Sequence, residues 1–173
     1  MPLFDYFRRQ TPVAPVELVN TPTERRRRAR AQVPPGTSVL IIDDSKTMVA
    51  ALGRMLRDNQ FEIFEAFDGE SGLEVLRKNK PSLIFLDIIL PGINGFEVLR
   101  RIRRSHYVAK TPVIAMSGNE AATEEYYIRR IGADDFMRKP CTRAEVFTRV
   151  ERLLALQPNA LGTTADTGML PND

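Results

Sequence analysis

The stretch Val39-Leu40-Ile41-Ile42-Asp43-Asp44 is an unbroken apolar run that ends in two carboxylates. A short run of this composition is typical of a buried β-strand. The arrangement recurs where Ser82-Leu83-Ile84-Phe85-Leu86 leads into Asp87, and where Asp134-Asp135-Phe136-Met137-Arg138 leads into Lys139. Parallel α/β sheets place their ligand sites at the carboxyl ends of the strands. We therefore expect the three acidic positions and the lysine to meet at one edge of a sheet.

The chain between residues 37 and 156 alternates strand-like and helix-like segments. Strand-like runs lie near 38–43, 61–66, 82–87, 112–116 and 134–138, and helix-like stretches near 45–58, 69–79, 94–104, 120–131 and 142–156. Five strand–helix units in series predict an α/β fold, a doubly wound five-stranded parallel sheet with five helices on its two faces. Ser45 and Thr142 suit helix N-caps, and Gly132 suits a helix C-cap.

The two ends of the chain differ in composition from this domain. Residues 1–36 contain six prolines and little apolar periodicity, and residues 157–173 are polar and turn-rich, so we expect a disordered arm and tail. Residues 1–37 hold seven arginines and three acidic residues, a net charge of +4 in a chain of net charge +3. The basic character therefore belongs to the arm, and it does not by itself indicate a core that binds nucleic acid.

Other sequence features narrow the class of protein. No apolar stretch approaches the roughly 20 residues that span a bilayer, and the N-terminus lacks the layout of a secretory signal. The single cysteine, Cys141, excludes an internal disulfide and suits a reducing compartment. A cytoplasmic protein is expected.

The residues at the strand ends suit phosphoryl chemistry. Clustered carboxylates repel one another unless a cation lies between them, and oxygen ligands favour Mg²⁺ or Mn²⁺. Asp43, Asp44 and Asp87 suit such a site, and an aspartate such as Asp87 is also able to form an acyl phosphate. Lys139 offers an ammonium, and Ser117, directly after the run 112–116, offers a hydroxyl to the phosphoryl oxygens.

This set of motifs resembles the response regulator receiver domain. The similarity covers about residues 37–156 and includes Asp-Asp-Ser at 43–45, Asp87 followed by Leu90-Pro91-Gly92 and Gly95, Ser117-Gly118, and Lys139-Pro140. The resemblance implies the strand order 2-1-3-4-5. The stretch Asp-Asp-Ser-Lys-Thr-Met at 43–48 is similar to the chemotaxis and pilus-motility members of the family.

The resemblance also implies roles for the acidic residues. Asp87 is expected to accept a phosphoryl group from a histidine kinase or phosphotransfer protein, which makes the chain a phosphoprotein of a two-component system. Asp44 is expected to bind Mg²⁺ directly and Asp43 partly through water, with the backbone carbonyl of Ile89 completing the protein ligands. Lys139 is expected to pair with the phosphoryl oxygens.

The output is implied by the same resemblance. Ser117 and the aromatic residue Phe136 are expected to move on phosphorylation and to reshape the face made by the fourth helix, the fifth strand and the fifth helix. A downstream protein is expected to bind there. Tyr126 and Tyr127, on the fourth predicted helix, are either docking residues of this face or ordinary half-buried aromatics.

Two positions depart from the commoner pattern of the family. Cys141 follows Lys139-Pro140 where a larger apolar residue is usual, and we interpret it as a buried, inert packing residue. Ile89 lies two residues after the phosphoacceptor, where several relatives carry a polar residue. Its branched side chain is expected to hinder water and to prolong the phosphorylated state.

The arm has several interpretations. Arg25, Arg26, Arg27, Arg28 and Arg30 form a dense cationic run. The run suits a solubilising linker, or a segment that binds nucleic acid, a cyclic dinucleotide or anionic lipid. Leu3, Phe4 and Phe7 would share one face of a short helix, followed by Arg8-Arg9, as in a docking or membrane-surface segment.

The chain length predicts a regulator that acts by binding. About 17 residues follow the last predicted helix, too few for a DNA-binding or catalytic output domain, so we expect a stand-alone regulator whose only chemistry is its own phosphorylation. Oligomeric state is left open. Two alternatives stay open: an aspartyl-phosphate type of phosphatase, and a non-phosphorylated adaptor that works through the arginine-rich arm.

Overall fold

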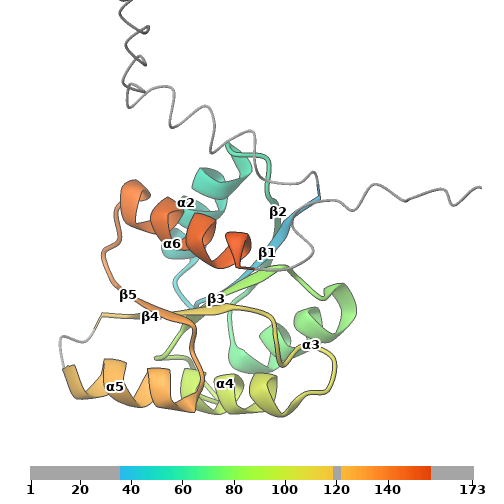
Figure 1. The fold of residues 1–173 in the computed structure, drawn as a ribbon, viewed down its shortest axis with the longest axis vertical. Coiled ribbons are helices and arrows are strands. Elements are labelled where there is room, and N and C mark those ends of the chain that lie inside the picture. Colours follow the sequence, from blue (N-terminus) through green and yellow to red (C-terminus); the bar gives the residue numbers. More distant parts are fainter. Residues whose placement is uncertain (1–35, 119–121, 157–173) are drawn as a thin grey trace, which may run out of the picture. The chain divides into compact units, whose positions relative to one another are not determined.

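The computed structural model describes residues 36–118 and 122–156, which form one sheet and five helices (Figure 1). The predicted tail and nearly all of the predicted arm, with its arginine run at 25–30, lie outside the described residues. Within them, no helix combines the length and the apolar composition needed to cross a membrane.

The elements follow the predicted alternation. The strands are β1 (Ser38–Ile42), β2 (Glu62–Ala66), β3 (Leu83–Asp87), β4 (Val113–Ser117) and β5 (Asp135–Arg138). The helices are α2 (Lys46–Arg57), α3 (Gly69–Asn79), α4 (Gly95–Arg104), α5 (Ala122–Ile131) and α6 (Arg143–Ala155). All strands pair in parallel in the order β2-β1-β3-β4-β5, which confirms the predicted fold class and strand order.

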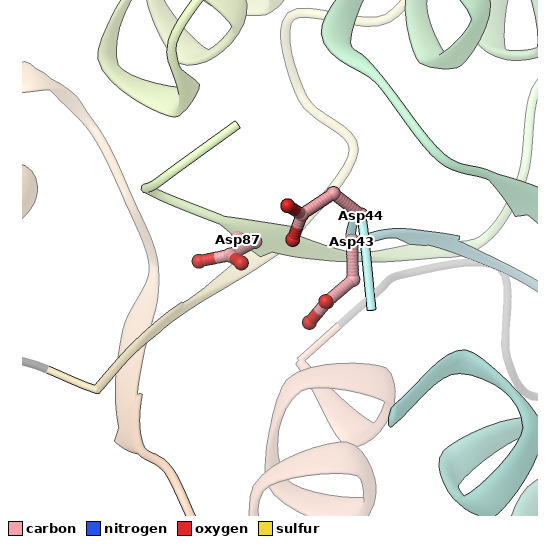
Figure 2. A group of neighbouring side chains, drawn as sticks. All are labelled: Asp43, Asp44 and Asp87. Atoms are coloured by element: carbon pink, nitrogen blue, oxygen red, sulfur yellow. The ribbon is translucent and has the colours of Figure 1, made fainter. Parts of the chain in front are cut away.

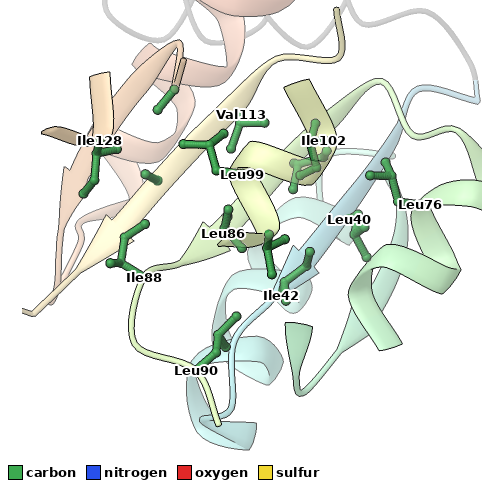
Figure 3. Close-up of a cluster of buried hydrophobic side chains, with 14 of the residues drawn as sticks. Leu40, Ile42, Leu76, Leu86, Ile88, Leu90, Leu99, Ile102, Val113 and Ile128 are labelled. Carbon is green, nitrogen blue, oxygen red and sulfur yellow. The ribbon is translucent and has the colours of Figure 1, made fainter. Parts of the chain in front are cut away.

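Two apolar layers cover the sheet. The helices α2 and α6 pack on one face, and α3, α4 and α5 pack on the other (Figure 1). The second layer contains Leu40, Ile42 and Leu86 from the sheet against Leu99 and Ile102 from α4 (Figure 3). Because helices cover both faces, β1, β3 and β4 are buried along their whole length, which explains their continuous apolar sequences.

Side chains at the helix ends fix where the helices begin and stop. The Ser45 side chain accepts a hydrogen bond from the N–H of Met48, and Thr142 forms a reciprocal capping box with Glu145. Gly132 follows α5 with φ +120°, a conformation that favours glycine. The three predicted caps are therefore confirmed.

Arg103 ties the end of α4 to the loops that precede β4 and β5. Its guanidinium donates to the backbone carbonyls of Gly132, Ala109 and Thr111 at 2.7–3.0 Å, and to Asp134 Oδ2 at 2.6 Å. The same Asp134 oxygen accepts the N–H of Val113 at 2.7 Å. One half-buried cation therefore satisfies the backbone of two loops that are distant in sequence.

Replacing Arg103 by alanine is expected to lower the free energy of unfolding by about 3 kcal/mol, because several carbonyls and a carboxylate lose their donor together. Arg100→Ala is the matched control, since the ion pair given for this neighbouring arginine among the described residues is a long one, with Glu97 at 4.0 Å. The control is expected to change stability by about 0.5 kcal/mol or less. Urea unfolding measures both, and equal losses would contradict the role of Arg103.

Candidate functional site

The ends of β1 and β3 bring the predicted carboxylates together. In the register of the two strands, Ile42 lies beside Leu86, so the next residues, Asp43 and Asp87, are neighbours at the carboxyl edge. Figure 2 shows Asp43, Asp44 and Asp87 converging on one region from these two strand ends. One oxygen from each of the three carboxylates lies within 4.8 Å of the others.

Lys139, directly after β5, joins two of these carboxylates. Its Nζ atom lies 2.6 Å from Asp43 Oδ2 and 2.7 Å from Asp87 Oδ2. Asp43 and Asp87 are buried, whereas Asp44 is exposed. The remaining oxygen of each buried carboxylate accepts a backbone N–H, from Ser45 at 3.0 Å and from Ile89 at 3.1 Å. The cluster is therefore held rigidly on its buried side and open on the side of Asp44.

The protonation of the cluster follows from burial and from this ion pair. Burial raises the pKa of Asp87, although the hydrogen bonds from Lys139 and from the N–H of Ile89 oppose the shift. Burial also acts to lower the pKa of Lys139, but the hydrogen bonds and charges of Asp43 and Asp87 outweigh it and raise that pKa. Lys139 therefore remains an ammonium at neutral pH, and it supports the ionised form of Asp87 that nucleophilic attack requires.

The loop after β3 approaches Asp87 closely. Gly95 donates its N–H to the carbonyl of Ile88 at 3.0 Å, and a Cβ atom at residue 95 would lie 2.2 Å from the Asp87 carbonyl oxygen. Only glycine leaves room for this contact. Glu70, at the start of α3, accepts the N–H of Ile93 at 3.3 Å and supports the same loop. The glycine of the sequence motif thus fixes the backbone that carries Asp87.

The acidic cluster fits a divalent cation. Asp43 Oδ2 is buried, and its contact among the described residues is the ion pair with Lys139 at 2.6 Å, which leaves a lone pair able to face a second cation. Three hard oxygen donors, one of them solvent-exposed, match the preference of Mg²⁺ or Mn²⁺ for carboxylates plus water. Asp43, Asp44 and Asp87 would hold such an ion, which would neutralise charge on a phosphoryl group.

The two predicted switch residues lie on the same face of the sheet. Ser117 is the last residue of β4, one position beyond Met116, the partner of Asp87. It is fully buried, and its carbonyl accepts the N–H of Lys139 at 2.8 Å. Phe136 lies beside Ala115 in the sheet and packs in the layer of α3, α4 and α5. Ala115 and Ser117 are two residues apart in β4, so their side chains share this face. This placement brings both side chains towards α5.

A cluster around Asp135 was missed by the sequence analysis. This buried carboxylate contacts Arg129 of α5 at 3.1 Å and Arg149 of α6 at 3.4 Å, and it also pairs with Arg152 of α6. Asp135 also accepts the N–H of Phe136 at 2.8 Å, and Arg149 donates to the Phe136 carbonyl at 3.2 Å. The network thus links the predicted switch position to both flanking helices. Its only sequence signal was an aspartate at the start of a buried strand.

Three further predictions gain structural detail. Cys141 is half-buried against the layer of α2 and α6, and burial raises its thiol pKa, as expected of a packing residue. Ile89 is 62% exposed beside Asp87.

Tyr126 and Tyr127 of α5 are each 59% exposed, with ring centroids 5.7 Å apart in an edge-to-face arrangement. Both rings are therefore exposed enough to contact a partner.

Comparison with known proteins identifies the family. Residues 39–151 match the family described as the response regulator receiver domain. The chain belongs to this family. The predicted motif set and the strand order of the receiver domain agree with that assignment.

Relatives of known sequence or structure share this receiver domain. The chain is 30% identical over 117 residues to Protein PilH of Pseudomonas aeruginosa, covering 68% of this chain and 97% of PilH. It is similar to a putative response regulator from Chloroflexus aurantiacus, with 29% identity and a TM-score of 0.67, covering 69% of this chain and 98% of that one. The receiver domain of NtrX from Brucella abortus is 30% identical with a TM-score of 0.65, at 69% and 99% coverage.

Mg²⁺ is expected to stabilise the receiver domain against heat, because the ion binds the folded carboxylate cluster and not the unfolded chain. At about a hundredfold excess over its dissociation constant, the gain is about 2.7 kcal/mol. Asp44→Asn is expected to remove most of this gain, whereas Glu62→Gln, an exposed acid at the start of β2, retains it. Thermal unfolding with and without Mg²⁺ measures the effect. An undiminished shift in Asp44→Asn would exclude Asp44 as a ligand.

Proposed function

We propose that this protein is a phosphorylation-dependent response regulator that receives a phosphoryl group on Asp87. The observation that carries the proposal is the contact of one ammonium, Lys139, with two buried carboxylates at 2.6 and 2.7 Å. A buried carboxylate with an adjacent ammonium and a cation-binding pair has the parts that phosphoryl transfer requires. The donor is a phosphohistidine on a histidine kinase or a phosphotransfer protein.

The transfer is a displacement at phosphorus. A carboxylate oxygen of Asp87 forms the new O–P bond while the P–N bond of the donor phosphohistidine breaks. The electron pair of the P–N bond stays on the imidazole nitrogen. Lys139 exchanges its contact with Asp87 for one with a phosphoryl oxygen. Asp43 and Asp44, together with the Ile89 carbonyl, would hold Mg²⁺, which would offset the negative charge of the phosphoryl group. The Ser117 hydroxyl then hydrogen-bonds the phosphoryl group.

The signal leaves through the face formed by α5, β5 and α6. Movement of Ser117 makes room for Phe136, and both lie on the side of the sheet that α5 covers. The exposed pair Tyr126 and Tyr127 on α5 offers aromatic docking area to a downstream protein. The similarity to PilH, which consists almost entirely of the matched region, supports a stand-alone regulator of the pilus-motility or chemotaxis type in the cytoplasm.

Phosphorylation of Asp87 is tested by intact mass. The parent protein with Mg²⁺ and acetyl phosphate is expected to gain one phosphoryl group, and Asp87→Asn is expected to gain none. Asp58→Asn serves as the matched control, because Asp58 is an exposed aspartate at the end of α2.

The same assay distinguishes the alternatives. Steady release of phosphate from varied monoesters would assign the protein to the aspartyl-phosphate phosphatases. No mass gain under any condition would favour a non-phosphorylated adaptor that acts through the arginine run at 25–30.

Ile89 is expected to prolong the phosphorylated state. Its exposed branched side chain lies two residues from Asp87, where it hinders the approach of water to the acyl phosphate. Ile89→Asn is expected to lose the phosphoryl group several-fold faster, and Leu156→Asn, at another exposed apolar site, is expected to match the parent. Decay followed by mass after donor removal measures the lifetime, and equal or slower loss in Ile89→Asn would refute the effect.

A further inference from the structure

Every described helix ends at the same edge of the sheet. Because the strands are parallel and each helix runs back against them, the helices stop at the amino edge, opposite the carboxyl edge that holds Asp87. All five have basic residues in their last turn. Strands of five residues separate the two edges by roughly 16 Å. Charge at the amino edge is therefore remote from the phosphorylation site.

The charge is least balanced where α3 and α4 end. Arg77, Lys80, Arg104 and Lys110 are all exposed there, and none forms an ion pair with another described residue. Glu74 of α3 is already paired with Lys78 at 2.7 Å, and Glu97 lies in the first turn of α4, at the other end of that helix, where it pairs with Arg101 at 2.9 Å. We call Arg77, Lys80, Arg104 and Lys110, with the neighbouring Tyr107, the basic edge.

Helix stability does not account for all of this charge. A cation in the last turn of a helix interacts favourably with the helix dipole, which is sufficient reason for Arg77 and Arg104. Lys80 is the C-cap of α3 in a left-handed conformation with φ 46°, and Lys110 lies in the turn before β4. Neither lies inside a helix. Lys80 still benefits from the end of the α3 dipole, and together the four exposed cations form a positive surface that is able to attract an anionic ligand.

Exposed apolar groups accompany these cations. Tyr107 is 85% exposed, and Lys80 Nζ lies 5.9 Å from the centroid of its ring, which joins the ends of α3 and α4. Leu156, at the end of α6 on the same sheet edge, is 74% exposed. Aromatic and aliphatic side chains beside lysine and arginine suit the interface of a bilayer, whereas an aliphatic side chain gains little from a phosphate backbone.

The sequence before β1 has the same chemistry. Phe4 and Phe7 precede Arg8-Arg9, and the arginine run at 25–30 follows. Apolar residues combined with polybasic segments provide the two signals that stable attachment to a membrane surface requires. This composition favours lipid over nucleic acid as the ligand of the basic edge.

We propose that the basic edge docks the receiver domain on the surface of an anionic lipid bilayer. The cations contact lipid phosphates and carboxylates, and Tyr107 lies at the level of the headgroups. The phosphorylation site at the opposite edge then faces away from the membrane and stays open to its partner. The proposal is independent of the phosphorylation of Asp87.

The test uses the full chain and sedimentation with vesicles of phosphatidylcholine, with or without about one third phosphatidylserine. The parent is expected to bind only the anionic vesicles, and more weakly as salt rises. Lys80→Gln/Lys110→Gln removes two charges outside the helices and is expected to weaken binding roughly thirtyfold. Arg77→Gln/Arg104→Gln is expected to show a similar loss.

Lys46→Gln/Arg143→Gln is the matched control, because it removes two exposed cations at the helix starts on the opposite edge. This pair, and Asp87→Asn, are expected to bind within about twofold of the parent. Equal loss in the control and test pairs would overturn the proposal, as would no binding to anionic vesicles. Duplex DNA binding that depends on Lys80 and Lys110, without vesicle binding, would assign the edge to nucleic acid instead.

Discussion

Lys139 reaches across the end of β4 to place its ammonium between two carboxylates from neighbouring strands, and the site depends on this contact. Asp43 and Asp87 are buried side by side, so their charges would repel without a cation. The same residue donates its N–H to Ser117, the end of the intervening strand. One side chain and its backbone thus connect the ends of β1, β3, β4 and β5. An added phosphoryl group competes for an ammonium that already holds the sheet edge together.

The alternation of side chains along the strands would transmit a change at the phosphorylation site to the core of the domain. Alternate residues of a strand face opposite sides, so Ala115 and Ser117 share the face on which Phe136 packs. The backbone of Phe136 is in turn hydrogen-bonded to the side chains of Asp135 and Arg149. Asp135 is also paired with Arg129 of α5 and Arg152 of α6. A displacement of Ser117 at the end of β4 would therefore act on a tightly packed residue, Phe136, whose backbone is hydrogen-bonded on both sides. A packed element of this kind would respond to phosphorylation by switching between discrete states, because a close-packed core does not deform gradually.

The fold and the carboxylate cluster could be predicted because both follow from local sequence. Apolar runs define the strands, and the polar residue after each run must lie at the carboxyl edge. The contacts of Arg103 and Asp135 could not be predicted, because they join residues from 6 to 31 positions apart whose meeting depends on helix packing. Asp134 was assigned to the fifth strand, but it lies just before it and binds Arg103 and the N–H of Val113.

The strand β5 lies at the edge of the sheet, but the backbone groups in its middle are not available for pairing with another strand. An edge strand normally presents free N–H and C=O groups, to which a strand of another protein is able to pair. At Phe136, in the middle of β5, the Asp135 carboxylate takes the N–H and the Arg149 guanidinium takes the carbonyl. The sheet is thereby closed to extension by β-augmentation at its centre. A partner that docked at this face would have to recognise side chains, so its specificity would depend on the surface pattern of α5 and α6.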